Sequence, residues 1–274
     1  MKANNVIMSL CAALVLVSGV YAGGAKQQQP GSGEKLTIEN GVLAVGMAIE
    51  YPPMEYYDVD GKTPIGFDVQ LGKALADKLG LKVKYVDTAW EGIFAGVNKG
   101  DYDVIISGVT ITQERLDAHN FTKPYIGNAM TIVLRKDSPI TIEKPEDIAG
   151  YRVCYQAETT ADIYATRLAQ QGVQFEAFEY DNIMQCFDEM KVGRVDIIVV
   201  DSLVAFEYVS SADSPFTIVW QGAADEKFGI CLKKGNAALT SALDKALDEL
   251  FAEGTMLKIS QSIFARDLVS TARQ

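Results

Sequence analysis

Hydroxyl groups, a glycine amide and an arginine are concentrated in the segment 107–115, directly after an apolar run. An arginine guanidinium holds a carboxylate through two parallel charge-assisted hydrogen bonds, and hydroxyl and amide groups satisfy the remaining lone pairs. The segment therefore predicts a site for a small carboxylate. Its candidate donors are Ser107, Gly108, Thr110 and Arg115. The alternative is that Thr112 caps a helix and leaves the arginine as a solvated surface charge.

Complementary groups occur in the second half of the chain. Asp201 follows the apolar run 195–200 and suits a ligand ammonium, although it can equally be the N-cap of the next helix. The strand-like run that ends at Tyr155 leads into a polar segment and a helix, whose free amides can hold an anionic or carbonyl oxygen. The candidates there are Gln156, Glu158, Thr159 and Thr160. Arg115 and Asp201 together provide what an amino-acid zwitterion requires.

Two aromatic residues in loop-like contexts, Tyr51 and Trp90, complete the candidate site. Their flat apolar rings can sandwich a ligand side chain. The alternative for both is ordinary core packing.

Alternating strand and helix patterns are expected to position these residues. Such βα alternation predicts α/β architecture with parallel sheets, in which ligands lie at the carboxyl ends of strands. We expect Asp68 and Asp181 to cap helices that glycines end. The predicted strands are 43–46, 81–85, 104–106, 131–134, 151–155, 195–200 and 228–232, and the predicted helices are 69–79, 93–97, 160–169, 182–192 and 240–251.

The first 22 residues are typical of a secretory signal peptide. Lys2 precedes the apolar run 6–17, and small residues at 20 and 22 predict cleavage after Ala22. A membrane-spanning helix needs about 20 apolar residues, more than this run provides. Cys11 is a poor lipid-attachment site because the apolar region continues past it. We therefore expect a periplasmic protein that is not a lipoprotein, with 23–34 as a flexible leader.

Composition narrows the function further. A formal net charge of -11 argues against nucleic acid as a partner. The cysteines have no metal-type spacing, so neither a metal nor another cofactor is expected. Cys154 and Cys186 are either buried thiols or a disulfide. The single histidine, His119, is expected at the surface.

Several of these segments resemble the bacterial family 3 solute-binding proteins, the amino-acid-binding components of ABC importers. Residues 66–75, Gly-Phe-Asp-Val-Gln-Leu-Gly-Lys-Ala-Leu, look like that family's signature, with Gln70 where an acid is usual. Tyr51-Pro52-Pro53-Met54 resembles the family's aromatic lid. Segment 107–115 resembles the stretch that grips the ligand carboxylate, and Asp201 resembles the aspartate that binds the ammonium. The likeness covers roughly residues 38 to 265.

The resemblance implies a two-lobed periplasmic-binding-protein fold of type II. Each lobe would be a mostly parallel sheet flanked by helices, and two hinge strands would join the lobes. Residues 35–126 and 224–274 would form lobe 1, and 127–223 lobe 2. The implied protein is a monomer that closes on a free polar amino acid, arginine or glutamine first, and delivers it to the membrane permease of an ABC transporter.

Two departures from the family pattern bear on the ligand. Glu158 stands where the family usually has glycine before a threonine pair, and Ala48 stands where basic-ligand binders have an aspartate. No catalytic constellation is apparent, so the protein is not expected to be an enzyme. The alternatives are a cyclohexadienyl or arogenate dehydratase on the same fold, with Glu158 as general acid, or a diffusible amino-acid sensor.

Overall fold

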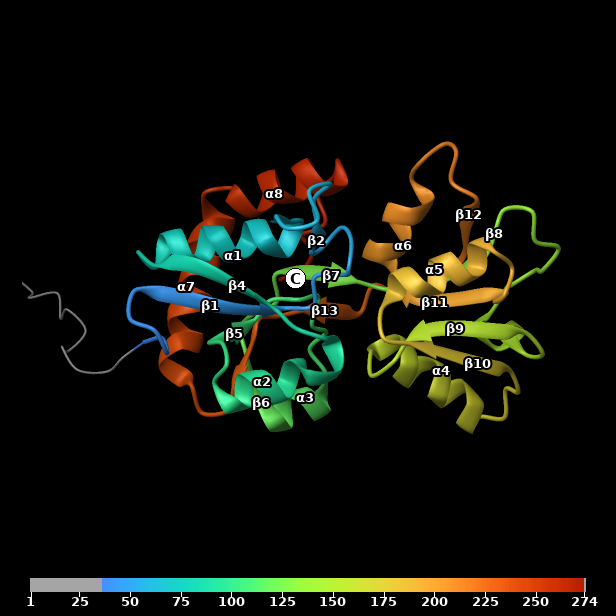
Figure 1. Ribbon diagram of the computed structural model, residues 1–274, viewed down its shortest axis with the longest axis horizontal. Helices are drawn as coiled ribbons and strands as arrows, with labels where there is room; N and C mark the ends of the chain where they lie inside the picture. The colour runs from blue at the N-terminus through green and yellow to red at the C-terminus, as the bar shows by residue number, and fades with distance from the viewer. Residues whose placement is uncertain (1–35, 274) are drawn as a thin grey trace, which may run out of the picture. The chain divides into compact units, whose positions relative to one another are not determined.

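The computed structural model describes residues 36–273, which form two five-stranded sheets with helices packed on them (Figure 1). The predicted signal peptide, its cleavage point and the predicted leader all lie outside the described residues. Within 36–273, no helix is long and apolar enough to span a membrane.

The first sheet combines strands from both ends of the described chain. β1 is parallel to both β4 and β5, whereas β14 is antiparallel to β5 and β6. Across this sheet the strand order is β4 (Lys82–Asp87), β1 (Val42–Met47), β5 (Val104–Ile105), β14 (Cys231–Lys233) and β6 (His119–Phe121).

The second sheet uses only strands from the middle of the chain. β9 is parallel to β10 and β11, and β8 is antiparallel to β11 and β12. Its order is β10 (Glu176–Tyr180), β9 (Arg152–Gln156), β11 (Ile197–Asp201), β8 (Met130–Arg135) and β12 (Phe216–Gln221). Each sheet therefore has three adjacent parallel strands and an antiparallel side, which is the two-lobed α/β fold expected from the sequence.

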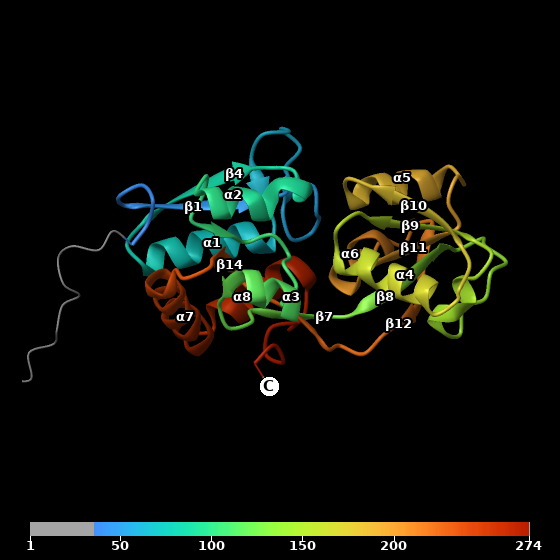
Figure 2. The same ribbon diagram turned by 90° about the horizontal axis from the view of Figure 1, so that it is seen from below.

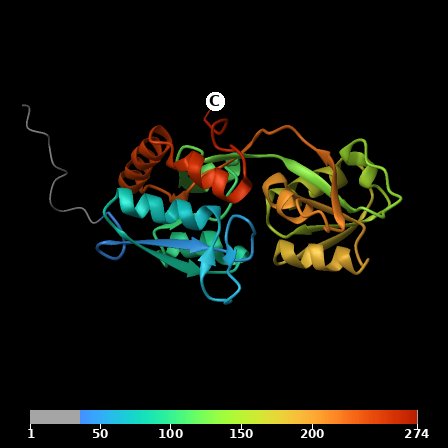
Figure 3. The same cartoon turned by 90° about the horizontal axis from the view of Figure 1, so that it is seen from above.

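Two antiparallel strands, β7 (Ile126–Asn128) and β13 (Glu226–Phe228), lie where the chain passes between the sheets. Figures 2 and 3 show these two crossings, one running into β8 and the other returning from β12. A short hairpin, β2 (Tyr56–Tyr57) with β3 (Pro64–Ile65), precedes the first long helix. The helices are α1 (Phe67–Lys78), η1 (Trp90–Gly92), α2 (Ile93–Lys99), α3 (Gln113–Ala118), η2 (Pro145–Ile148), α4 (Thr160–Gln170), α5 (Ile183–Lys191), α6 (Ser202–Val209), α7 (Ala237–Ala252) and α8 (Thr255–Phe264).

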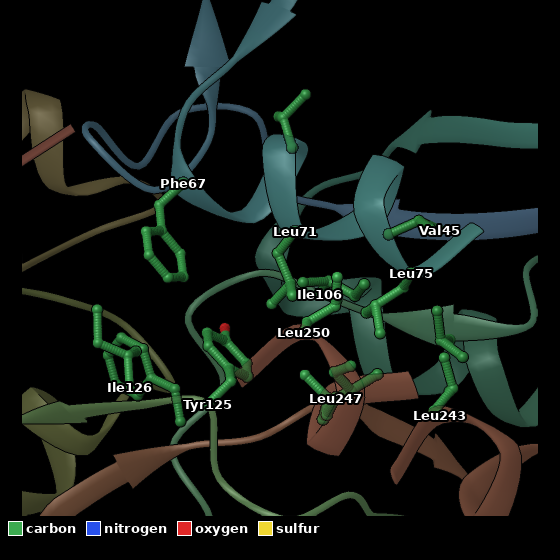
Figure 4. Packing of buried hydrophobic residues seen from close by; sticks show 14 of the residues in the cluster. Val45, Phe67, Leu71, Leu75, Ile106, Tyr125, Ile126, Leu243, Leu247 and Leu250 are labelled. Atoms are coloured by element: carbon green, nitrogen blue, oxygen red, sulfur yellow. The ribbon is translucent and has the colours of Figure 1, made fainter. Parts of the chain in front are cut away.

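The apolar face of α1 packs against that of α7 over the first sheet (Figure 4). Leu71 and Leu75 recur at helical spacing, as do Leu243 and Leu247, so each helix presents one apolar stripe to the core. Their side chains are fully buried. Fixing α1 in this way also fixes Asp68 in its first turn, which accepts a hydrogen bond from the amide of Gly108.

Three predictions about element ends were wrong. Gly66, not Asp68, is the N-cap of α1, and the aspartate side chain is buried in the first turn, where it binds other partners. Asn182, not Asp181, caps α5 through its side chain. The predicted strand 228–232 is two short strands, because residues 229–230 pass from the pairing with β7 to the first sheet.

Cys154 of β9 and Cys186 of α5 form a disulfide, with Cα atoms 5.8 Å apart. The alternative of two buried thiols is therefore wrong for this pair. Both cysteines are fully buried in the core of the second lobe, and Cys231 is a buried free thiol.

Removal of this disulfide is expected to destabilise the protein. The bond joins residues 32 positions apart, and a closed loop of that length contributes about 3–4 kcal/mol in the chain-entropy model. Cys154→Ala/Cys186→Ala should therefore lower the urea midpoint of unfolding. Cys231→Ala keeps the disulfide, so reductant should lower its urea midpoint as much as it lowers that of the parent protein. Equal midpoints for the double variant and the parent protein would contradict the prediction.

Candidate functional site

A cavity of about 340 Å³ is lined by residues from both halves of the chain. Its size is at the small end of the range for ligand sites. Ten of the eleven residues predicted from the sequence line it: Tyr51, Trp90, Ser107, Gly108, Thr110, Arg115, Gln156, Thr159, Thr160 and Asp201. The fold therefore brings together strand ends that are nearly 100 residues apart in the sequence, as expected for ligand sites of open α/β sheets.

The arginine of the cavity is held in place by its own segment. Thr112 caps α3 by accepting a hydrogen bond from the backbone amide of Arg115 at 3.2 Å, so the cap and the site coexist. The guanidinium donates to the carbonyl of Thr110 at 3.0 Å and lies 5.5 Å from the ring centre of Trp90 and 5.1 Å from that of Phe94. These contacts position the fork before a ligand arrives, although burial lowers the pKa of Arg115.

Ser107 and Gly108 already have protein partners at the end of β5. The serine hydroxyl donates to Glu55 at 2.5 Å and accepts from the amide of Ala48 at 3.0 Å. The glycine has a φ of +55°, and a Cβ atom there would lie 3.0 Å from the ring of Tyr51. Glycine is therefore required both by the backbone conformation and by the close approach of the aromatic ring.

Glu55 and Asp68 form a buried pair of carboxyl groups beneath this strand end. Both are fully buried, and Asp68 accepts from the amide of Gly108 at 2.7 Å and from the hydroxyl of Tyr125 at 2.9 Å. The other oxygen of each carboxyl group has no donor among the described residues. Burial raises the pKa of Asp68 to about 7 and that of Glu55 well above its ordinary value. A proton shared between the two groups satisfies both orphaned oxygens.

This pair makes the stability of the protein depend on pH. The folded state holds a proton that the unfolded state loses above about pH 4. The stabilisation that this proton contributes is therefore complete below about pH 4 and is lost as the pH rises through about 7. In Asp68→Asn the amide replaces the shared proton, and we expect a flatter profile of melting temperature between pH 5 and 8. Asp77→Asn, which alters an exposed ion pair with Lys73, should retain the original profile. Identical profiles for all three proteins would contradict this assignment.

Asp201 lies at the end of β11 and is 7% exposed. It accepts hydrogen bonds from the hydroxyl of Tyr51 and from the side-chain amide of Asn128. Burial raises its pKa, and these two hydrogen bonds oppose the shift. Although Asp201 is the N-cap of α6 by position, its side chain makes no capping hydrogen bond, which leaves the carboxylate for contacts in the cavity.

The polar segment after β9 also lines the cavity. Thr159 caps α4, accepting from the amide of Asp162 at 3.4 Å, and the hydroxyls of Thr160 and Thr110 are 3.5 Å apart. Gln156 donates to the carbonyl of Asp181 at 3.0 Å. The segment therefore presents hydroxyl groups and a helix N-terminus to the cavity, as predicted.

Glu158 is the one predicted site residue that does not line the cavity. Its side chain is exposed, and its φ is +59°, a left-handed conformation that favours glycine. Its carbonyl accepts from the indole of Trp90 at 3.2 Å and from Arg115 at 3.5 Å. The structure thus brings the backbone of Glu158, but not its carboxylate, to the site.

Four carboxylates that line the cavity were not predicted: Glu55, which is paired with Asp68, and an acidic rim made of Glu50, Asp87 and Asp181. The three rim residues are neighbours in the fold. Asp87 accepts from the amide of Ile49 at 3.3 Å, and Glu50 accepts at 2.9 Å from Asn182, the residue that follows Asp181. Ala48, which stands where basic-ligand binders have an aspartate, lines the same cavity as this acidic rim. A weak signal was available, since Asp87 follows a predicted strand and Glu50 precedes the lid tyrosine.

The prediction that His119 is a surface residue was wrong. It is 5% exposed and its ring lies 5.3 Å from that of Phe94, because the strand β6 places it against α2. Burial and the charge of Arg115 lower its pKa. Among residues 36–273 no group of three or more histidine, cysteine or acidic side chains is placed to hold a metal ion.

Known proteins share this fold and this sequence pattern. A family model described as bacterial extracellular solute-binding proteins, family 3, matches residues 43–266. The L-cystine-binding protein TcyJ of Escherichia coli (strain K12) is 30% identical over 230 residues, which cover 84% of this chain and 85% of that protein.

Two solved structures relate the fold to known ligands and activities. An ancestral arginine-binding protein bound to arginine is 35% identical with a TM-score of 0.78, covering 82% of this chain and 99% of that one. The ancestral amino-acid-binding protein AncCDT-1, a precursor of cyclohexadienyl dehydratase, is 32% identical with a TM-score of 0.74, covering 82% and 95%.

Proposed function

Because the chain belongs to the bacterial extracellular solute-binding proteins of family 3, we propose that it binds a free polar L-amino acid in the cavity described above. Arg115 would hold the α-carboxylate together with the hydroxyl groups of Thr110 and Thr160. Asp201 would hold the α-ammonium, and Tyr51 and Trp90 would flank the side chain. The opposite charges of Arg115 and Asp201 within one small cavity are the observation that carries this proposal.

The acidic rim supports arginine over glutamine as the ligand. Glu50, Asp87 and Asp181 line the cavity, and carboxylates bind a guanidinium through charge-assisted hydrogen bonds that a neutral amide cannot match. Gln156 also lines the cavity and can donate or accept. Similar ancestral arginine-binding proteins are solved with arginine and with glutamine bound, so the preference for arginine rests on the acidic rim. The name of TcyJ makes cystine a further competing ligand.

The proposed cellular role is delivery of this amino acid to the permease of an ABC transporter. The protein would be a periplasmic monomer, made with a signal peptide at 1–22 and a leader at 23–34. Lobe 1 would comprise 35–126 and 224–274, and lobe 2 residues 127–223. Ligand contacts from both lobes would stabilise the closed form, which the permease would recognise.

A thermal-shift screen tests the proposed function. Protein refolded without ligand would be heated with each of the twenty amino acids and with cystine. A ligand that binds only the native state raises the melting temperature by mass action, and we expect the largest rise with L-arginine. No rise with any amino acid would contradict the proposal.

Charge neutralisation of the rim is expected to reduce selectivity. Glu50→Gln/Asp181→Asn should weaken L-arginine binding about tenfold, because each lost carboxylate removes roughly 0.5–1 kcal/mol of partly screened attraction. Binding of L-glutamine should change by less than threefold. The ratio of the two dissociation constants from calorimetry is the measurement, and a ratio equal to that of the parent protein would place the rim outside ligand recognition.

A dehydratase of prephenate or arogenate is the second candidate, because AncCDT-1 is described as a precursor of such an enzyme. The expected general acid was Glu158, and its exposed side chain gives this candidate no support. Product formation from either substrate by the purified protein, abolished in Glu158→Gln, would favour it. Binding of an amino acid without turnover of either compound would favour the transport role.

A further inference from the structure

Glu226 is a close neighbour of Asp201, whose carboxylate is proposed to bind the ligand ammonium. The side-chain nitrogen of Asn128 donates to Asp201 at 2.5 Å and to Glu226 at 2.7 Å. Because one nitrogen atom contacts both groups, the two carboxylate oxygens are within about 5 Å of each other, the range in which like charges shift each other's pKa. Glu226 is partly buried and does not line the cavity.

Backbone pairing places Glu226 and Asn128 side by side. Glu226 begins β13 and pairs directly with Asn128 at the end of β7. The hydroxyl of Ser202 donates to the side-chain oxygen of Asn128 at 3.1 Å, which orients the amide so that its nitrogen faces the two carboxyl groups. All three residues therefore sit on the strands that join the two sheets and on the adjoining start of α6.

The groups around Asp201 and Glu226 carry too little positive charge to neutralise two ionised carboxylates. The titratable groups that act on the two carboxyls are Tyr51, Arg115 and Asp225, of which Arg115 alone is a cation. Burial and the charge of Asp201 raise the pKa of Glu226 to about 8. Burial also raises the pKa of Asp201, but its hydrogen bonds with Tyr51, Asn128 and Glu226 oppose that shift. At neutral pH the pair therefore carries one proton, which is held on Glu226.

We propose that Glu226 is a positioning residue of the ammonium site and that amino-acid binding at Asp201 releases a proton from it. The ligand ammonium keeps its three hydrogens and brings a positive charge next to the pair, so the O–H bond of Glu226 breaks and the proton passes to solvent. Binding then becomes tighter as the pH rises, by up to about tenfold per pH unit, and levels off once the pair has lost its proton. This inference rests on the proposed function, because it requires an amino-acid ammonium at Asp201.

Calorimetry in buffers with different ionisation enthalpies tests the proposal. L-Arginine, with L-glutamine in parallel, would be titrated into refolded protein at pH 7, and the slope of observed heat against buffer enthalpy gives the number of protons released. We expect about one proton per ligand for the parent protein and close to none for Glu226→Gln. Asp77→Asn alters an exposed carboxylate that pairs with Lys73 away from the cavity, and this variant should retain the release of the parent protein.

Binding by the parent protein without net proton release would overturn the inference. Proton release by Glu226→Gln equal to that of the parent protein would also overturn it. Both outcomes would leave the proposed function intact. Because the slope of the parent protein alone can contradict it, the test holds even if Glu226→Gln does not fold. Failure of every amino acid to bind any of the proteins would contradict the proposed function, and this inference with it.

Discussion

Arg115→Ala is expected to weaken the binding of L-arginine about 100-fold or more. The guanidinium would make two charge-assisted hydrogen bonds with the ligand carboxylate, and their loss costs roughly 3 kcal/mol. The fork is already oriented by the carbonyls of Thr110 and Glu158 and by the rings of Trp90 and Phe94. Its loss therefore removes a preorganised anchor, and isothermal calorimetry measures the change.

The matched control for this prediction is Arg194→Ala. Arg194 is exposed, pairs with Glu189 at 2.8 Å and does not line the cavity. We expect its affinity for L-arginine to equal that of the parent protein, and both variants to melt within a few degrees of it. An Arg115→Ala protein whose affinity for L-arginine is within threefold of the parent protein would show that Arg115 does not bind the ligand.

Asp201→Asn is expected to have an effect of similar size. The substitution preserves shape but removes the negative charge that would attract the ligand ammonium, and a buried charge-assisted hydrogen bond contributes about 1.5–3 kcal/mol. Tyr51 keeps an oxygen to which it can donate, whereas Asn128 then faces a second amide. We expect a loss of affinity of about 30- to 100-fold by calorimetry.

Asp196→Asn is the control for the aspartate substitution. It removes the partner of Arg152, a contact of 2.6 Å outside the cavity. It should lower stability slightly and leave the dissociation constant unchanged. An Asp201→Asn protein with the parent affinity would show that the ammonium is bound elsewhere.

The residues at strand ends were predictable from the sequence. Apolar runs mark the strands, and polar residues directly after them lie at the edge where ligands bind. Ser107 and Asp201 follow this rule, and Arg115 lies further along the segment that Ser107 begins; all three line the cavity. Thr112 was weighed as a helix cap that would leave Arg115 as a solvated charge. The structure shows the cap, but Arg115 lines the cavity, because the cap fixes the backbone that carries it.

Tertiary packing determined the residues that were missed or misplaced. Asp68 looks like a helix cap locally, but α1 begins at Phe67 and carries the aspartate side chain into the core beside Gly108. Glu50, Asp181 and Glu226 are acidic residues in an acidic chain, with no local pattern that separates them from solvated surface. They reach the site only because β7 and β13 bring the two sheets together, a long-range arrangement that periodicity does not encode.

The most direct test of zwitterion binding compares three ligands by calorimetry on refolded protein. L-Arginine has both α-groups, agmatine lacks the carboxylate and Nα-acetyl-L-arginine lacks the ammonium. The cavity with Arg115 and Asp201 predicts tight binding of L-arginine alone, with each analogue weaker by about 100-fold. Agmatine or the acetylated compound binding as tightly as L-arginine would contradict the proposed recognition of the amino-acid α-groups.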